Sequence, residues 1–178
     1  MKNLEIYIHI PFCVRKCEYC DFLSFPADDD AKLRYVKGLM AEMIFYGPLM
    51  KNYQVSSVYI GGGTPSSIDE QWIAALMEGV FDCFNVLPDA EISIECNPGT
   101  LSREKLLAYR DAGINRLSIG LQSANNDELK QLGRIHTFEQ FVTNYEVARN
   151  VGFKNINVDL MYGLPGQSAS QYMATVNK

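Results

Sequence analysis

Three cysteines stand close together near the start of the chain, at Cys13, Cys17 and Cys20. Their C-x3-C-x2-C spacing places three thiols in one short loop, which suits a disulfide, a zinc site or an iron–sulfur cluster. A structural zinc site usually takes its ligands as two pairs, and the sequence has no second pair of this kind. A cluster held by three thiolates would leave one iron open to another ligand. The spacing alone favours a cluster and leaves zinc open.

The composition is that of an ordinary globular domain. The 178 residues are 47% hydrophobic and 21% charged, with a net charge of −5. The sequence has neither the roughly 20 apolar residues in a row that a membrane-spanning helix needs nor the apolar block of a signal peptide. We therefore expect a cytoplasmic protein with reduced thiols, in which Cys83 and Cys96 are small buried residues. No Lys/Arg block is present, so nucleic acid is not an expected partner.

Alternating apolar segments are separated by helical patterns along the chain, and they predict a βα repeat of class α/β. The expected strands are 4–10, 55–60, 90–96, 115–122 and 155–161. Five helices are expected to begin near 28–30, at a capping box from Ser67, at Ser102, and at capping boxes from Thr137 and Ser168. A further short helix is expected over 126–132. Such an order implies parallel strands joined by right-handed helical crossovers.

One face is polar on four of the five expected strands. Because successive strand side chains point to opposite faces, Tyr7, Glu95, Gln122 and Asp159 lie on the faces opposite the apolar ones. Parallel strands that are covered on both sides are normally apolar throughout. We therefore expect a partial TIM-like barrel with helices outside and a polar, ligand-holding cavity inside, in preference to a sheet with one bare face. Ligands in such folds lie at the carboxyl ends of the strands.

A glycine-rich stretch, Gly-Gly-Gly-Thr-Pro at 61–65, follows the second expected strand. It matches neither a Walker A loop nor the dinucleotide-binding fingerprint. Three consecutive glycines indicate that the backbone comes close to a bound group. Arg134 suits a ligand carboxylate, because a guanidinium pairs with it through two hydrogen bonds, and Asp159 suits ribose hydroxyls. Taken singly, each of these charged residues is more often a solvated one.

The combination of motifs resembles the radical S-adenosylmethionine (SAM) superfamily. The cysteine and glycine motifs carry this resemblance, and the segments 7–13, 95–100, 118–123 and 159–165 narrow it to the oxygen-independent coproporphyrinogen III oxidase group, and within that group to the HemW-type haem chaperones. It covers essentially the whole chain. It implies that residues 1–178 form five of the six β/α units of a radical SAM core, with the sixth strand and a C-terminal domain lying outside this chain.

The resemblance also implies the cofactors. Cys13, Cys17 and Cys20 would bind three irons of a [4Fe–4S] cluster, and the amino and carboxylate groups of SAM would bind the fourth. In the family, an electron from the reduced cluster cleaves SAM to methionine and a 5′-deoxyadenosyl radical. The implied SAM-contacting positions, some of them near the cluster, are Tyr7, Tyr19, Gly62, Gly63, Thr64, Glu95, Gln122, Arg134 and Asp159.

Phe22 separates two functions within this resemblance. In the coproporphyrinogen oxidases the cysteine motif resembles C-x3-C-x2-C-x-C, with a fourth cysteine at its end. In this sequence Phe22 stands at the position of that fourth cysteine. The departure implies a haem chaperone that binds haem and delivers it to haem proteins, with an electron donor as a further partner. The less favoured alternative is an enzyme that decarboxylates coproporphyrinogen III to protoporphyrinogen IX through the SAM-derived radical. A zinc-binding or purely structural β/α module is the third hypothesis.

Overall fold

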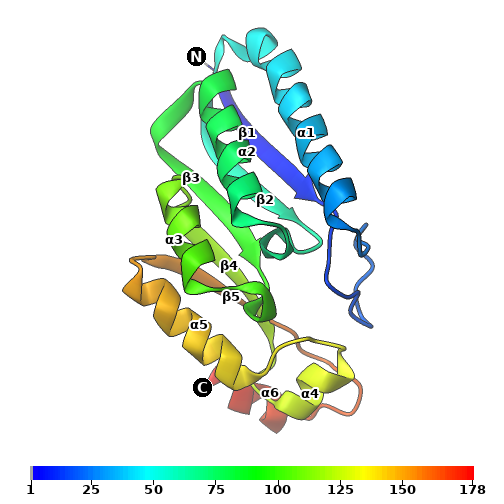
Figure 1. The fold of residues 1–178 in the computed structure, drawn as a ribbon. Coiled ribbons are helices and arrows are strands. Elements are labelled where there is room, and N and C mark those ends of the chain that lie inside the picture. The colour runs from blue at the N-terminus through cyan, green and yellow to red at the C-terminus, as the bar shows by residue number, and fades with distance from the viewer. Residues whose placement is uncertain (1) are drawn as a thin grey trace.

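The computed structural model describes residues 2–178 and contains one five-stranded parallel sheet (Figure 1). Neighbouring strands follow the chain order without exception, so each crossover moves the chain by one strand in the same direction. The strands are β1 (Lys2–Ile10), β2 (Tyr53–Gly62), β3 (Val86–Cys96), β4 (Arg116–Gln122) and β5 (Asn155–Leu160). The expected α/β class with five parallel strands is therefore confirmed.

Helices α1, α2, α3 and α5 lie side by side over one face of the sheet, and the short helices α4 and α6 lie near each other at one end of it (Figure 1). The larger helices are α1 (Asp29–Tyr46), α2 (Glu70–Cys83), α3 (Arg103–Asp111) and α5 (Phe138–Asn150), and the shorter ones are α4 (Asn126–Gln131) and α6 (Ala169–Val176). Three 3-10 turns, η1 (Gly47–Met50), η2 (Pro65–Ser67) and η3 (Pro98–Thr100), complete the elements of the described chain.

The helix-covered face of the sheet holds the core. Ile10, Ile60, Ile94 and Ile119 are fully buried there, together with the apolar stripe of α2. Complete burial of such a side chain contributes about 1.5–3 kcal/mol, so the period-2 pattern determines which face the helices cover. Cys96 is buried as expected, and Cys83 is half-buried against the core.

Side-chain caps determine where most helices begin. Thr137 and Ser168 form the expected capping boxes, and Ser102 is the N-cap of α3. The capping box expected from Ser67 is wrong, because α2 begins at Glu70 and its N-cap is Asp69, whose carboxylate accepts from Gln71 N. Ser67 instead ends the 3-10 turn that starts at Pro65, and its hydroxyl donates to the Phe12 carbonyl.

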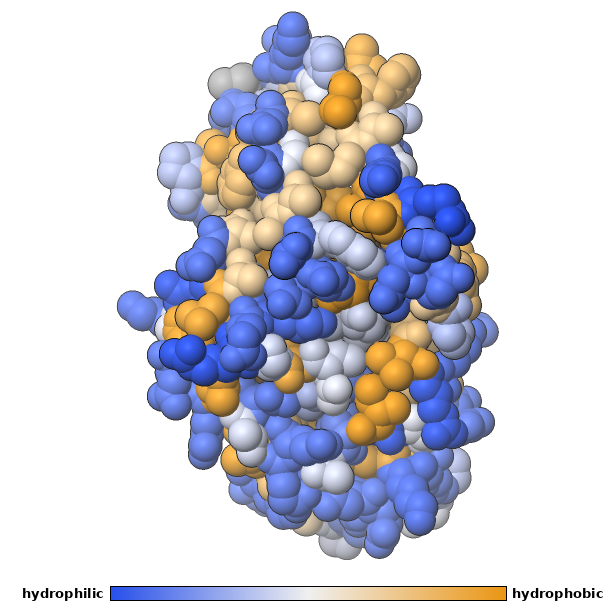
Figure 2. Space-filling model, in the orientation of Figure 1, coloured by the Kyte–Doolittle hydropathy of each residue, from blue (hydrophilic) through white to orange (hydrophobic). Residues whose placement is uncertain are grey.

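The outer surface on the helix side is largely hydrophilic (Figure 2). Apolar atoms show between the hydrophilic ones near the C-terminal end of α1, where Ile44, Phe45 and Leu49 are exposed. None of the helices within residues 2–178 is long and apolar enough to cross a membrane.

Candidate functional site

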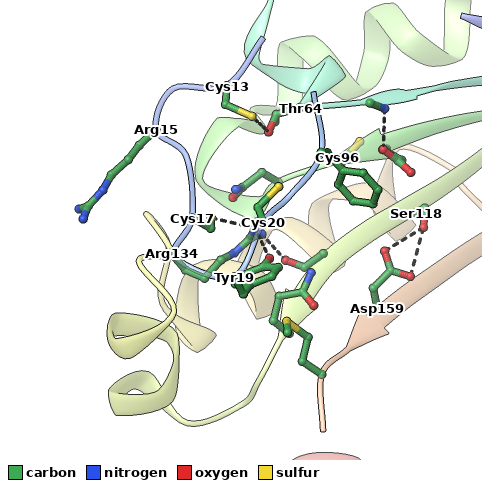
Figure 3. A pocket seen from close by; sticks show the side chains of 18 residues that line it. Cys13, Arg15, Cys17, Tyr19, Cys20, Thr64, Cys96, Ser118, Arg134 and Asp159 are labelled. Atoms are coloured by element: carbon green, nitrogen blue, oxygen red, sulfur yellow. Dashed lines mark hydrogen bonds between the residues drawn. The ribbon is translucent and has the colours of Figure 1, made fainter. Parts of the chain in front are cut away.

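A cavity of about 350 Å³ opens at the carboxyl ends of the strands, on the polar side of the sheet (Figure 3). Its volume lies within the range of roughly 300–1,000 Å³ that is common for small-molecule sites. The cysteine loop after β1 forms one wall, and the ends of β2 to β5 form the others. The cavity brings together the expected site residues Cys13, Cys17, Tyr19, Cys20, Gly62, Gly63, Thr64, Glu95, Gln122, Arg134 and Asp159.

Tyr7 does not line this cavity, although it lies on the expected face of β1 and is 59% exposed. Its hydroxyl lies 3.0 Å from His9 Nδ1. Its ring stacks on Tyr59, with ring centroids 6.2 Å apart, and Tyr59 in turn donates to Glu95. Tyr7 therefore stands one ring away from the residues of the cavity.

The cysteine loop is closed at its base by backbone hydrogen bonds. Phe25 N donates to the Pro11 carbonyl at 3.0 Å, and Cys13 N donates to the Phe25 carbonyl at 3.2 Å. At the tip of the loop, Glu18 N donates to the Leu132 carbonyl, which ties the loop to the end of α4. These contacts hold the three thiols at the mouth of the cavity, as the labelled cysteines in Figure 3 show.

The three thiols fit an iron–sulfur cluster. All three are free and half-exposed, and all three line the same cavity. Within the described residues, no three His, Cys, Asp or Glu side chains converge closely enough to hold a single metal ion. A cluster does not need such convergence, because each thiolate binds a different iron. The Cys13 sulfur also lies 3.4 Å from Thr64 Oγ1, so the cysteine loop and the glycine-rich stretch meet directly.

Two of the glycines are required by this close approach. A Cβ at Gly63 would lie 2.8 Å from the Phe12 carbonyl oxygen and 3.0 Å from the Cys13 sulfur. Gly62 has a φ of 119°, a conformation that L side chains rarely adopt, and its N–H points to Glu95. The glycine-rich stretch therefore presents backbone, without side chains, to the cavity.

Glu95 joins the ends of β2 and β3. Its Oε1 accepts from the Tyr59 hydroxyl at 2.8 Å, and its Oε2 accepts from Gly62 N at 3.0 Å. Burial raises the pKa of Tyr59, and the hydrogen bond to the Glu95 carboxylate raises it further. The phenol therefore keeps its proton and remains a donor. This arrangement fixes both the carboxylate and the turn of the glycine-rich stretch.

Arg134 reaches the cavity from the loop that follows α4. Its Nη2 donates to the Gly120 carbonyl at 2.5 Å, and its Nη1 donates to the Tyr19 hydroxyl at 3.3 Å and lies 3.8 Å from the Cys17 sulfur. Its Nε is buried and has no partner within residues 2–178. A buried donor without a partner is rare in proteins.

Gln122 and Asp159 complete the wall formed by β4 and β5. Gln122 has a φ of 71° and follows an irregularity in the β4–β5 register. Asp159 accepts from Ser118 Oγ at 3.2 Å and from Asn157 Nδ2 at 2.6 Å, and Figure 3 shows the contact with Ser118. The polar residues on this side of the sheet therefore orient one another.

Several residues of the site were not singled out from the sequence as ligand contacts. Phe22, Ser118, Asn97 and Met161 line the cavity, and strand alternation predicts only the polar-face positions of Ser118 and Met161. A buried network behind the wall was also missed. In it, Ser66 Oγ accepts from Asn97 N and lies 2.6 Å from Thr100 Oγ1. These contacts join turns that follow different strands, so no short motif reveals them.

Lys105 holds the turn η2, which follows the glycine-rich stretch. Its Nζ donates to the carbonyls of Ser66 and Ile68, each at 2.8 Å, although burial lowers its pKa. Because Lys105→Met leaves both carbonyls without this charged donor, we expect it to lower the free energy of unfolding by about 2 kcal/mol. Urea unfolding measures the change. Lys37→Met, on the exposed side of α1, is the control and should stay within about 0.5 kcal/mol. Equal unfolding midpoints for the two variants would contradict the assignment.

Comparisons with known proteins agree with this geometry. The model of the radical SAM superfamily matches residues 7–178. The heme chaperone HemW of Bacillus subtilis (strain 168) is 39% identical over 172 residues, which cover 96% of this chain and 45% of that protein. The heme chaperone HemW of Escherichia coli (strain K12) is 38% identical over 181 residues, which cover 98% of this chain and 47% of that protein.

A solved structure is also similar. Coproporphyrinogen III oxidase (HemN) from Escherichia coli, described as a radical SAM enzyme, superposes with a TM-score of 0.91 at 33% identity. The match covers 99% of this chain and 41% of that one. The chain therefore spans about half the length of the curated relatives it matches.

Proposed function

The chain belongs to the radical SAM superfamily, and on this basis we propose that its cavity holds a [4Fe–4S] cluster and SAM. We also propose that the whole protein transfers haem. The observation that carries the proposal is the meeting, in one cavity, of three free thiols with the guanidinium-bearing side chain of Arg134. A cluster with three protein ligands leaves one iron for the amino and carboxylate groups of SAM. Residues 1–178 would then be the radical SAM core of a longer protein.

Each side chain has a proposed part in binding. Cys13, Cys17 and Cys20 hold the cluster, which supplies the electron for SAM cleavage when it is reduced. Arg134 suits the carboxylate of SAM, because its fork can donate to both oxygens. The remaining proposed SAM contacts are the backbone of Gly62 and Gly63, Thr64, the polar side chains of Glu95, Gln122 and Asp159, and the rings of Tyr7 and Tyr19.

Haem delivery is the function we favour for the whole protein. The two curated relatives are both named heme chaperones, at 38–39% identity. Phe22 lines the cavity. It stands at the position where the oxidase pattern has a further cysteine. The partners would be haem, the proteins that accept it and an electron donor. The second candidate is the oxidation of coproporphyrinogen III, which the similarity to HemN supports.

Haem titration of the full-length protein separates the two candidates. We expect the anaerobically reconstituted protein to give a shifted Soret band that saturates near one haem per chain. An unshifted band at stoichiometric haem would eliminate the chaperone function. In parallel, incubation with coproporphyrinogen III, SAM and a reductant should yield no protoporphyrinogen, and its formation would establish the oxidase. Metal analysis tests the third hypothesis, since a cluster gives about four irons with matching sulfide, against one zinc.

A further inference from the structure

His136 is buried behind the wall of the cavity without lining it. It lies in the loop between α4 and α5, two residues after Arg134, and the residue is 3% exposed. Its Nε2 lies 3.3 Å from the carbonyl oxygen of Leu121, at the end of β4. Its Nδ1 lies 3.2 Å from Oδ1 of Asn97, directly after β3. The imidazole therefore lies between the ends of the two strands that carry Glu95 and Gln122.

Leu121 is the extra residue of a β-bulge. The β4–β5 register passes from Gly120 opposite Asp159 directly to Gln122 opposite Leu160, and Leu121 is paired in neither the β3 nor the β5 register. A bulge leaves its extra residue outside the ladder and turns the neighbouring side chains, which is why bulges are common beside active sites. The buried carbonyl of such a residue needs a donor from elsewhere, and His136 provides it.

The bulge also accounts for the backbone of Gln122. Its φ of 71° makes it the one non-glycine residue with a positive φ in the described part of the chain. Residues persist in this region of backbone space where the surrounding structure holds them, and such residues gather at functional sites. Gln122 lines the cavity from this position, and its own carbonyl accepts from Met161 N at 2.9 Å.

The hydrogen-bond chemistry assigns the proton of the ring. The Leu121 carbonyl is only an acceptor, so Nε2 must carry a proton to bond it. Asn97 Oδ1 already accepts from Gly99 N at 3.0 Å, so it has less need of a second donor. Burial lowers the pKa of His136 to about 4, and the nearby Arg134 guanidinium lowers it too, so at neutral pH the ring keeps a single proton. That proton lies on Nε2.

We propose that His136 is a positioning residue for SAM, whose Nε2–H holds the bulged Leu121 carbonyl and so presents Gln122 to the cavity. Its Nδ1 then carries no proton and makes no hydrogen bond to Asn97 Oδ1, so the ring acts through its bond to Leu121. Arg134 donates to the adjacent Gly120 carbonyl, so the loop that follows α4 holds two consecutive carbonyls of β4. This inference rests on the proposed function of the same cavity.

Three substitutions at position 136 test it in the cluster-loaded protein. His136→Gln places an amide N–H where Nε2 stands, His136→Asn reaches only as far as Nδ1, and His136→Leu removes both nitrogens. We expect the Kd for SAM to rise about tenfold in the Asn and Leu variants, as for the loss of one buried hydrogen bond, and to stay within about twofold in the Gln variant. The Kd is read from the SAM-induced change in the EPR spectrum of the reduced cluster, and iron content is measured beside it.

The outcomes separate this inference from the proposed function. Wild-type protein with a full cluster and no response to SAM would refute the proposed function itself. Wild-type protein that binds SAM, with all three variants matching it or all three weakened alike, would overturn the role of His136 alone. Equal iron content in all four proteins would show that the cysteine loop is intact in each of them. A general loss of structure would lower the iron content as well.

A measurement on the unsubstituted side chain covers the case in which the Asn and Leu variants do not fold. The chain contains two histidines, so a spectrum of protein labelled with 15N at histidine is assigned by one variant, His9→Gln. We expect the His136 signals to show a proton on Nε2 at pH 7 and to shift when SAM is added to the oxidised, cluster-loaded protein. A proton on Nδ1 alone, or signals that SAM binding does not move, would overturn the proposal.

Discussion

We expect Cys17→Ala to prevent binding of the proposed iron–sulfur cluster and to leave the fold in place. The Cys17 side chain lies half-exposed in the loop after β1, outside the buried core, and its polar contact is the 3.8 Å approach of Arg134 Nη1. The two remaining thiolates are too few for a cluster that already has an iron without a protein ligand. We expect iron to fall from about four atoms per chain to near zero. The free energy of unfolding of the metal-free protein should change by less than about 1 kcal/mol.

Cys83→Ala is the matched control for this substitution. Cys83 ends α2 and packs against the core on the helix side of the sheet, away from the residues that line the cavity. The control should keep its iron, its sulfide and the EPR spectrum of the reduced cluster. A full reduced-cluster spectrum in the Cys17→Ala protein would show that the three thiols do not share one cluster.

Glu95→Ala is expected to weaken SAM binding by about 100-fold while iron content stays unchanged. The substitution removes the acceptor of two hydrogen bonds, from the Tyr59 hydroxyl and from Gly62 N. Each bond to a charged group contributes about 1.5–3 kcal/mol, and loss of even one releases the turn that faces the ligand. Glu95→Gln keeps one acceptor oxygen and a donor for the other contact, so its effect should be smaller. Equilibrium dialysis with labelled SAM under anaerobic conditions gives the Kd.

Glu5→Gln is the control for Glu95. Glu5 is exposed on the same polar side of the sheet, on β1, and does not line the cavity. Its removal should change the Kd for SAM by less than about twofold, as is usual for an exposed charge away from a site. If Glu95→Ala bound SAM as tightly as this control, Glu95 would have no part in the SAM site.

The strands, the polar face of the sheet and the cysteine loop could be predicted from the sequence because each depends on local patterns. Alternation in β1 and β3 assigned their two faces, and the cavity lies on the side that was expected to be polar. The spacing of Cys13, Cys17 and Cys20 alone required the thiols to share one loop. Capping residues such as Thr137 predicted helix starts, since the cap and the backbone N–H groups that it binds are three residues apart.

Ser67 and Tyr7 show where local patterns were insufficient. The hydroxyl of Ser67 is used by Phe12, far away in the sequence, and the turn that begins at Pro65 delays the start of α2. Tyr7 points to the expected side of the sheet, but alternation reports only the face and not the depth. The register pairs Tyr7 with Tyr59, three residues before Gly62, so its ring stands below the cavity.

The sequence by itself determined the order of the elements, the faces of the strands and the set of thiols, because these follow from the identity and spacing of neighbouring residues. Only the tertiary structure placed Lys105 against the turn η2, left Arg134 Nε without a partner among the described residues and brought His136 to the bulged carbonyl of Leu121. Each of these depends on strand register and on contacts between segments far apart in the chain. A β-bulge shifts such contacts by one residue, and no local periodicity records it.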